Sequence, residues 1–111
     1  MILGIDYGES WCGLATSEGS LAAPLKTIST KRIYEEAERL KPEKVVVGIS
    51  ESKMAEKTLV FVKKLQAWLK VPIETIDETL TSYEATKIKK NKSEQHAVAA
   101  ALILQRYLDN M

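Results

Sequence analysis

The chain has 111 residues, a formal net charge of +1 and one cysteine, which is enough for a domain with its own core but excludes an internal disulfide. Cys12 lies in an apolar segment, so we expect a core residue rather than a nucleophile, in a protein of the reducing cytoplasm. The opening "MILGIDYG" lacks the basic region of a signal peptide, and no apolar run approaches the roughly 20 residues of a membrane span. We therefore expect one cytoplasmic domain over residues 1–111, without a membrane segment.

The first third of the chain predicts a meander of three strands. "ILGIDYG" (residues 2–8) is a buried apolar run, and it is followed by "WCGLATS" (11–17) and "LAAPLKTIS" (21–29), with glycines as punctuation. Pro24 lacks a backbone donor, which favours an edge position for the third of these strands.

Helices and strands alternate in the rest of the chain. "TKRIYEEAERLKPE" (30–43) predicts a helix that Thr30 caps, and "KVVVGIS" (44–50) a strand covered on both faces. "KMAEKTLVFVKKLQAWLK" (53–70) predicts a helix. Its expected buried stripe consists of Ala55, Leu59, Val62, Leu65 and Leu69, flanked by Phe61 and Trp68 as packing residues.

A fifth strand, "PIETIDE" (72–78), precedes a short helix, "SYEATKIKK" (82–90), and a final helix, "SEQHAVAAALILQRYLDN" (93–110). The final helix is apolar nearly all round, so we expect it to be buried on more than one side. The order β-β-β-α-β-α-β-α-α predicts an α/β fold, in which a mixed five-stranded sheet (a β-meander, then alternating β and α units) is flanked by helices.

Acidic residues follow three of the predicted strands. Asp6 ends the first strand, Glu51 follows the fourth, and Asp77 and Glu78 end the fifth. Parallel strands present their carboxyl ends at a common edge, where like charges repel unless a cation joins them, and Mg²⁺ and Mn²⁺ prefer such oxygen ligands. Each acid also has a structural interpretation: Asp6 as a turn residue, Glu51 as a helix-start acid, and the Asp77–Glu78 pair as a strand end with a cap.

The positive charge is concentrated in "KIKKNK", which holds Lys87, Lys89, Lys90 and Lys92 without an acid. This segment is either a solvated helix end or a surface that contacts phosphates.

Five blocks in order, between residues 2 and 110, resemble the YqgF/RuvX family, the pre-16S ribosomal RNA nucleases that are also called Holliday-junction-resolvase-like. The blocks are "GIDYGESWCGLATS", "APLKTI", "KVVVGIS", "DETLTS" and "AAALILQRYLDN". The resemblance implies an RNase H-like fold and a divalent metal, Mg²⁺ or Mn²⁺, held by Asp6, Glu78 with Asp77 beside it, and the position of His96. His96 stands where the family carries an Asp, and Thr79 where it carries an Arg.

His96 therefore has two interpretations, as a neutral ligand or general base near a helix start, or as a partly buried histidine in an inactive site. The first function we expect is a metal-dependent nuclease for structured RNA, with a ribosomal RNA precursor as substrate. The alternatives are a non-catalytic nucleic-acid-binding or ribosome-associated factor and a resolvase for branched DNA, which needs a homodimer for its two cuts. ATPases of the actin kind also open with an apolar strand followed by DxG, but this chain is too short for their two-lobed architecture.

Overall fold

The computed structural model describes residues 1–49, 54–77 and 92–111, with only the backbone of residues 92–94. Five strands form one sheet: β1 (Ile2–Asp6), β2 (Trp11–Glu18), β3 (Leu21–Ser29), β4 (Lys44–Ile49) and β5 (Ile73–Asp77). Their spatial order is β3-β2-β1-β4-β5. The meander β1-β2-β3 is antiparallel, whereas β1, β4 and β5 run parallel. The predicted mixed sheet is confirmed, and so is the edge position of the strand that contains Pro24.

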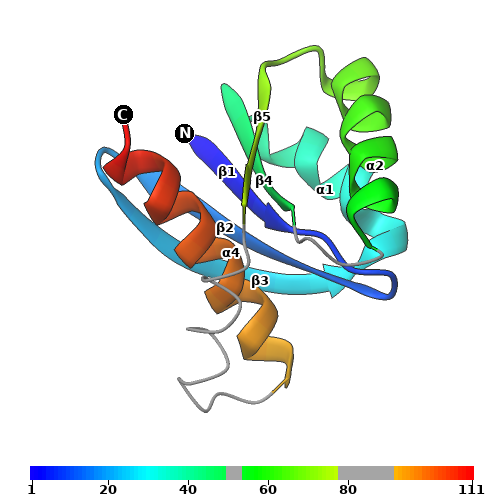
Figure 1. The fold of residues 1–111 in the computed structure, drawn as a ribbon, viewed down its shortest axis with the longest axis horizontal. Helices are drawn as coiled ribbons and strands as arrows, with labels where there is room; N and C mark the ends of the chain where they lie inside the picture. Colours follow the sequence, from blue (N-terminus) through cyan, green and yellow to red (C-terminus); the bar gives the residue numbers. More distant parts are fainter. Residues whose placement is uncertain (50–53, 78–91) are drawn as a thin grey trace.

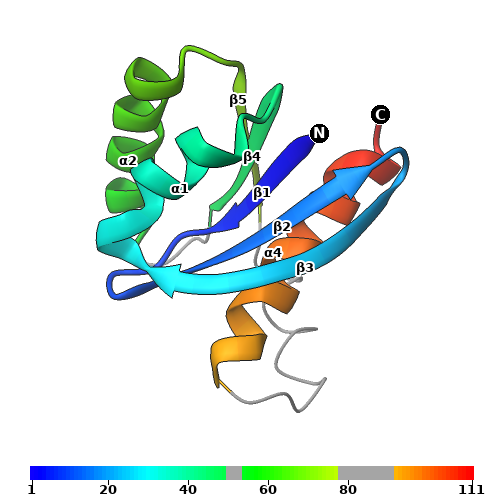
Figure 2. The same ribbon diagram turned by 180° about the vertical axis from the view of Figure 1, so that it is seen from behind.

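Helices cover both faces of the sheet (Figures 1 and 2). A 3-10 turn, η1 (Thr30–Arg32), leads into α1 (Ile33–Leu40), which lies with α2 (Met54–Leu69) on one face. The other face is covered by α4 (Lys92–Asp109). None of the helices described is long and apolar enough to cross a membrane. The short helix that the sequence predicts at residues 82–90 lies outside the described residues.

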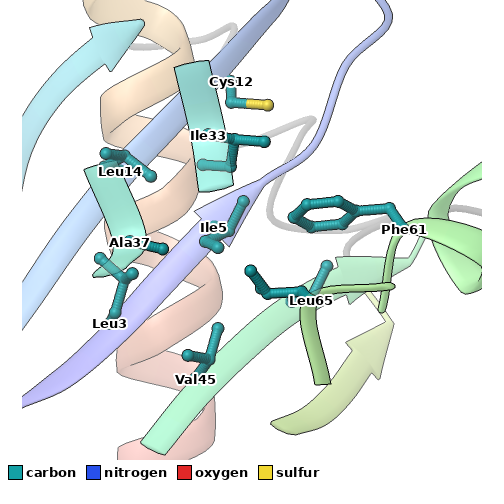
Figure 3. Close-up of a cluster of buried hydrophobic side chains, with 10 residues drawn as sticks. Leu3, Ile5, Cys12, Leu14, Ile33, Ala37, Val45, Phe61 and Leu65 are labelled. Atoms are coloured by element: carbon teal, nitrogen blue, oxygen red, sulfur yellow. The ribbon is translucent and has the colours of Figure 1, made fainter. Parts of the chain in front are cut away.

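The two faces of β1 and β4 carry two separate cores, because successive side chains on a strand alternate between faces. Leu3, Ile5 and Val45 pack under α1 and α2 in the cluster that Figure 3 shows. On the opposite face, Val46 packs with Ala100 of α4. Cys12 is fully buried in the first cluster, which confirms its prediction as a core residue. The β-branched run of β4 is therefore covered on both faces, as predicted.

The buried stripe of α2 agrees with the predicted one at Leu65, which is fully buried, and at Val62 and Leu69, which pack against the same core, but it differs at Leu59. Leu59 is 47% exposed, whereas Phe61 is only 2% exposed and fills the core with Leu65 and Thr58. Phe61, which the sequence predicts only to flank the stripe, belongs to the core because it stacks on Tyr7, with ring centroids 4.2 Å apart, and that contact depends on the end of β1. Helical spacing alone did not distinguish Phe61 from Leu59, since each stands three or four residues from another apolar position of the helix.

Two predicted helix caps also differ. Thr30 does not cap α1; its hydroxyl instead donates to the carbonyl of Gly8, 2.8 Å away. The sequence also offers Ser93 as the N-cap of the final helix, but α4 begins at Lys92, so that Ser93 lies inside the helix. The side chains described from Gln95 to Leu108 of α4 are all buried or half-buried, in agreement with the apolar pattern.

Candidate active site

The carboxyl ends of β1, β4 and β5 lie at one edge of the sheet, because the three strands are parallel neighbours. Asp6 ends β1 and Asp77 ends β5, as the sequence predicts. One strand separates them, so their backbones are roughly 10 Å apart at a strand spacing of about 4.8 Å. Two of the described strands therefore end in an acid at the same edge of the sheet.

Asp6 lies beside His96 of α4, although 90 residues of sequence separate them. The Nδ1 atom of His96 is 3.6 Å from Oδ2 of Asp6, and the two side chains are 36% and 16% exposed. This side-chain interaction is the main cause of a raised pKa of His96, while burial acts in the opposite direction. The pair is partly sheltered and still open to a ligand from solvent.

A close backbone approach sets the position of His96. Gly13 of β2 is the register partner of Asp6, and a Cβ atom at Gly13 would lie 1.8 Å from the carbonyl oxygen of His96. A Cβ atom at Gly4 would likewise lie 2.8 Å from Cβ of Leu104 on α4. Only glycine leaves room for the helix backbone at such distances. The two glycines thus bring α4 down onto β1 and β2 and place His96 next to Asp6.

The chain after Asp6 turns sharply, and the turn is tied down. A Cβ atom at Gly8 would lie 2.5 Å from the carbonyl oxygen of Trp11, so the turn has no room for a side chain there. The hydroxyl of Thr30 donates to the carbonyl of Gly8, and the amide of Thr30 donates to the carbonyl of Ser10. These bonds fix the loop that leaves the strand at Asp6.

Asp77 is placed on the other face of the sheet. Ile76 belongs to the cluster under α4 and Ile73 to the cluster under α1 and α2. By alternation, Asp77 shares the face of Ile73, and its side chain is exposed, whereas Asp6 faces α4. Asp77 therefore ends on the same edge as Asp6 without meeting it.

The other predicted site residues are not among those that the structure describes in full. Residues Glu51, Glu78, Thr79, Lys87, Lys89 and Lys90 lie outside the described residues, and Lys92 is described by its backbone only. Over residues 1–49, 54–77 and 92–111, no group of three or more His, Cys, Asp or Glu side chains could hold a metal ion. Of the predicted residues, the structure brings together Asp6 and His96.

The Asp6–His96 pair has suitable chemistry for a divalent cation. The separation of 3.6 Å is too long for a hydrogen bond. Two neighbouring ligand atoms of one cation, each about 2.1 Å from it, stand roughly 3–4 Å apart. A carboxylate oxygen with an imidazole nitrogen suits Mn²⁺ and similar ions better than Mg²⁺, which prefers oxygen. The pair fits two ligands of a site that requires further ligands.

Sequence reasoning missed the role of Gly13, which it treated as punctuation between turns. In the structure Gly13 lies inside β2, under the helix. Its signal was available, because a glycine within an apolar strand often marks a close backbone approach. Tyr7 was missed as well; it follows Asp6 directly and points to the opposite face, into the cluster with Phe61.

Comparison with known proteins agrees with this arrangement. The family model described as "RuvX: Holliday junction resolvase" matches residues 1–110. A protein of Chloroflexus aggregans, named "Putative pre-16S rRNA nuclease", is 37% identical over 131 aligned positions that cover 97% of this chain and 92% of its own. A protein of Natranaerobius thermophilus with the same name is 33% identical, with 97% and 93% covered.

Among solved structures, RuvC of T. thermophilus in complex with a Holliday junction substrate superimposes with a TM-score of 0.65. The two chains share 18% identity, and the match covers 98% of this chain and 93% of RuvC. This likeness concerns the fold, which is the RNase H-like arrangement that the family resemblance implies. From the family match over residues 1–110 and the identity to its curated relatives, the chain belongs to the RuvX family of Holliday junction resolvase-like proteins.

Proposed function

We propose that the protein is a divalent-metal-dependent nuclease that cuts structured RNA in the cytoplasm, with the 16S ribosomal RNA precursor as its substrate. The names of the curated relatives support the substrate class. The observation that carries the proposal is the Asp6–His96 pair at the carboxyl edge of the sheet. It combines two metal-ligating groups, from opposite ends of the chain, at the strand ends where ligands of α/β sheets bind.

We assign the metal to Asp6, His96 and Glu78, the acid that follows the end of β5, because Asp77 lies on the other face of the sheet from Asp6. When bound, the cation would activate a water molecule and stabilise the leaving oxygen of the phosphodiester. Asp6 supplies its carboxylate from a fixed strand end, and α4 holds the imidazole of His96 against it. The Asp6 side chain raises the pKa of His96, and Nδ1 would bind a cation only in the deprotonated imidazole.

The test is cleavage of a radiolabelled precursor 16S RNA fragment in Mn²⁺, Mg²⁺ or EDTA. We expect Asp6→Asn to lower the rate about 100-fold or more and Asp109→Asn, a matched change at the exposed end of α4, to leave it unchanged. Glu78→Gln tests the acid that follows β5, and we expect Asp77→Asn, on the other face of the sheet, to leave the rate unchanged. If Asp6→Asn cuts as fast as the wild type while its circular dichroism is normal, Asp6 is not a ligand.

His96→Asp tests the histidine directly. A ligand set with one nitrogen favours Mn²⁺, so we expect the ratio of Mn²⁺ to Mg²⁺ rates to fall in His96→Asp. Equal ratios in the two proteins would contradict a ligand role for His96. RNA binding in gel shifts without cleavage in any metal would instead indicate a non-catalytic factor.

A four-way DNA junction serves as the second substrate. A resolvase makes two cuts and needs two active sites, so sedimentation of the free protein and of the DNA complex accompanies this assay. Faster cleavage of the junction than of the RNA would show that branched DNA is the preferred substrate.

A further inference from the structure

A pocket of about 340 Å³ opens on the face of the sheet opposite to α4, between the end of β1 and the helices α1 and α2. Its lining includes Tyr7, Tyr34, Phe61 and Val60, together with the charged residues Lys57, Lys64 and Glu56. The volume lies at the small end of the range of ligand sites, roughly 300–1,000 Å³. Tyr7 is the residue that follows Asp6, so the pocket and the candidate active site share one strand end.

Aromatic rings form the wall of this pocket. Tyr7 stacks on Phe61, with centroids 4.2 Å apart and planes at 17°. Tyr34 meets Phe61 edge-on, with centroids 5.7 Å apart. Phe61 is buried, whereas both tyrosines are only half-buried, so their rings are the ones that a ligand can reach. Aromatic rings of this kind accept nucleobases by stacking, with little preference among bases.

The charge at the pocket comes from α2. Lys57 is paired with Glu9, with Nζ 2.6 Å from Oε1. Lys64 forms no salt bridge with any residue in the described part of the chain and is exposed. The lining also holds the acid Glu56, and Lys57 is neutralised by its pairing with Glu9, so Lys64 is the cation of this lining that a ligand can meet. An apolar wall with a cation at its rim matches a base joined to a phosphate.

We propose that this pocket binds one unpaired nucleotide of the substrate, with its base on Tyr7 and Tyr34 and its phosphate near Lys64. The identity of the ligand rests on the proposed nuclease function. A nucleotide held there lies on the opposite face of the sheet from the Asp6–His96 pair, because Asp6 and Tyr7 point to opposite faces at the same strand end. It would favour substrates with an unpaired nucleotide over continuous duplexes.

The test is a nuclear magnetic resonance titration of the ¹⁵N-labelled full chain in EDTA, with adenosine 5′-monophosphate, ribose 5-phosphate or inorganic phosphate. We expect adenosine 5′-monophosphate to shift the amides of Tyr7, Tyr34 and Val60 saturably. Ribose 5-phosphate should bind about tenfold more weakly, because it lacks the stacking base. Equal affinity for ribose 5-phosphate, or no saturable shift of these amides, would overturn the proposal.

Matched variants on α2 locate the site. Val60 is 52% exposed and lines the pocket, while its neighbour Leu59 is 47% exposed and does not. We expect Val60→Glu to weaken adenosine 5′-monophosphate binding at least tenfold and Leu59→Glu less than twofold, although both add the same charge to the same helix. The pair Lys64→Gln and Lys63→Gln repeats the comparison for the positive charge, because Lys64 lines the pocket and Lys63 does not. Equal weakening within either pair would contradict a nucleotide in this pocket.

The titration contains no metal and involves no cleavage. A protein that binds the nucleotide but cuts nothing would therefore refute the proposed nuclease function alone. A protein that cuts RNA normally with Val60→Glu and shows no base-dependent shift would refute the pocket alone.

Discussion

Gly13 of β2 lies so close to His96 of α4 that a Cβ atom added to the glycine would fall 1.8 Å from the histidine's carbonyl oxygen. Gly13 is also the register partner of Asp6. The backbone contact thus sets the distance between the two members of the candidate site.

Gly13→Ala should therefore separate Asp6 from His96. The added methyl group meets backbone rather than a flexible side chain, so α4 must shift, and we expect a decrease of about 3 kcal/mol in the free energy of unfolding. Urea denaturation measures this decrease, and the RNA cleavage assay measures the effect on the site. Gly19→Ala is the control: its site is open, but its φ of 69° is strained for alanine, so we expect about 1 kcal/mol and unchanged cleavage. Similar cleavage by both variants would mean that the contact does not position the site.

Asp6→Asn should lower the pKa of His96 toward its ordinary value of 6.5, because the carboxylate is the main cause of the increase. His96 is the chain's single histidine, so its imidazole proton can be followed by NMR during a pH titration. A raised pKa in the folded state means that the pair adds stability below pH 6.5 and loses it as the pH rises through the higher value. An unchanged midpoint in Asp6→Asn would show that the two side chains do not interact in solution.

Phe61→Ala should be severely destabilising, by about 3–5 kcal/mol, because it empties a fully packed position and removes the stack on Tyr7. Leu59→Ala, at a half-exposed position of the same helix, should cost less than about 1 kcal/mol. Thermal and urea unfolding of the two variants show whether Phe61 or Leu59 contributes more to the stability of the core. A larger loss of stability in Leu59→Ala would contradict the burial of Phe61.

Glu36 should make the protein sensitive to acid. Hydrogen bonds from Arg39 and Lys26 lower the pKa of this buried carboxyl from 4.5 to about 2. A lowered pKa in the folded state contributes stability above pH 4.5 that is lost as the pH falls toward 2. We expect Glu36→Gln to cost about 1–2 kcal/mol at neutral pH, reduced by solvent screening of the exposed Arg39, and almost nothing near pH 2. Glu35→Gln, at the exposed neighbouring position, is the charge-matched control; a difference between Glu36→Gln and wild type that stays constant with pH would refute the assignment.

The lysine cluster can be tested by the salt dependence of RNA binding. We propose that Lys87, Lys89, Lys90 and Lys92 contact phosphates, so that changing all four to Gln should flatten the plot of log affinity against log salt concentration. The expected decrease in slope is about 0.7 for each phosphate of a single strand that the variant no longer neutralises. A charge-matched variant changes four exposed lysines elsewhere, at Lys31, Lys41, Lys63 and Lys70. Equal slopes for the two variants would show that the four lysines are solvated and do not contact phosphates.

The sequence by itself determined the order of the described strands and helices, the mixed sheet and the edge at which acidic strand ends lie. These follow from local patterns: the continuous β-branched run of β4 requires cover on both faces, and parallel neighbours must end at one edge. Asp6 could be selected in this way because it stands directly at the end of an apolar strand.

Only the tertiary structure decided which side chains meet. His96 could be named from the family resemblance, but its approach to Asp6 depends on Gly13, which local patterns treat as a break. Asp77 ends on the predicted edge yet lies on the other face, since a shift of one residue along a strand reverses the side chain. The burial of Phe61 in place of Leu59, and the aromatic pocket beside it, likewise depend on packing between β1 and α2, because residues 54 positions apart in the sequence form that contact.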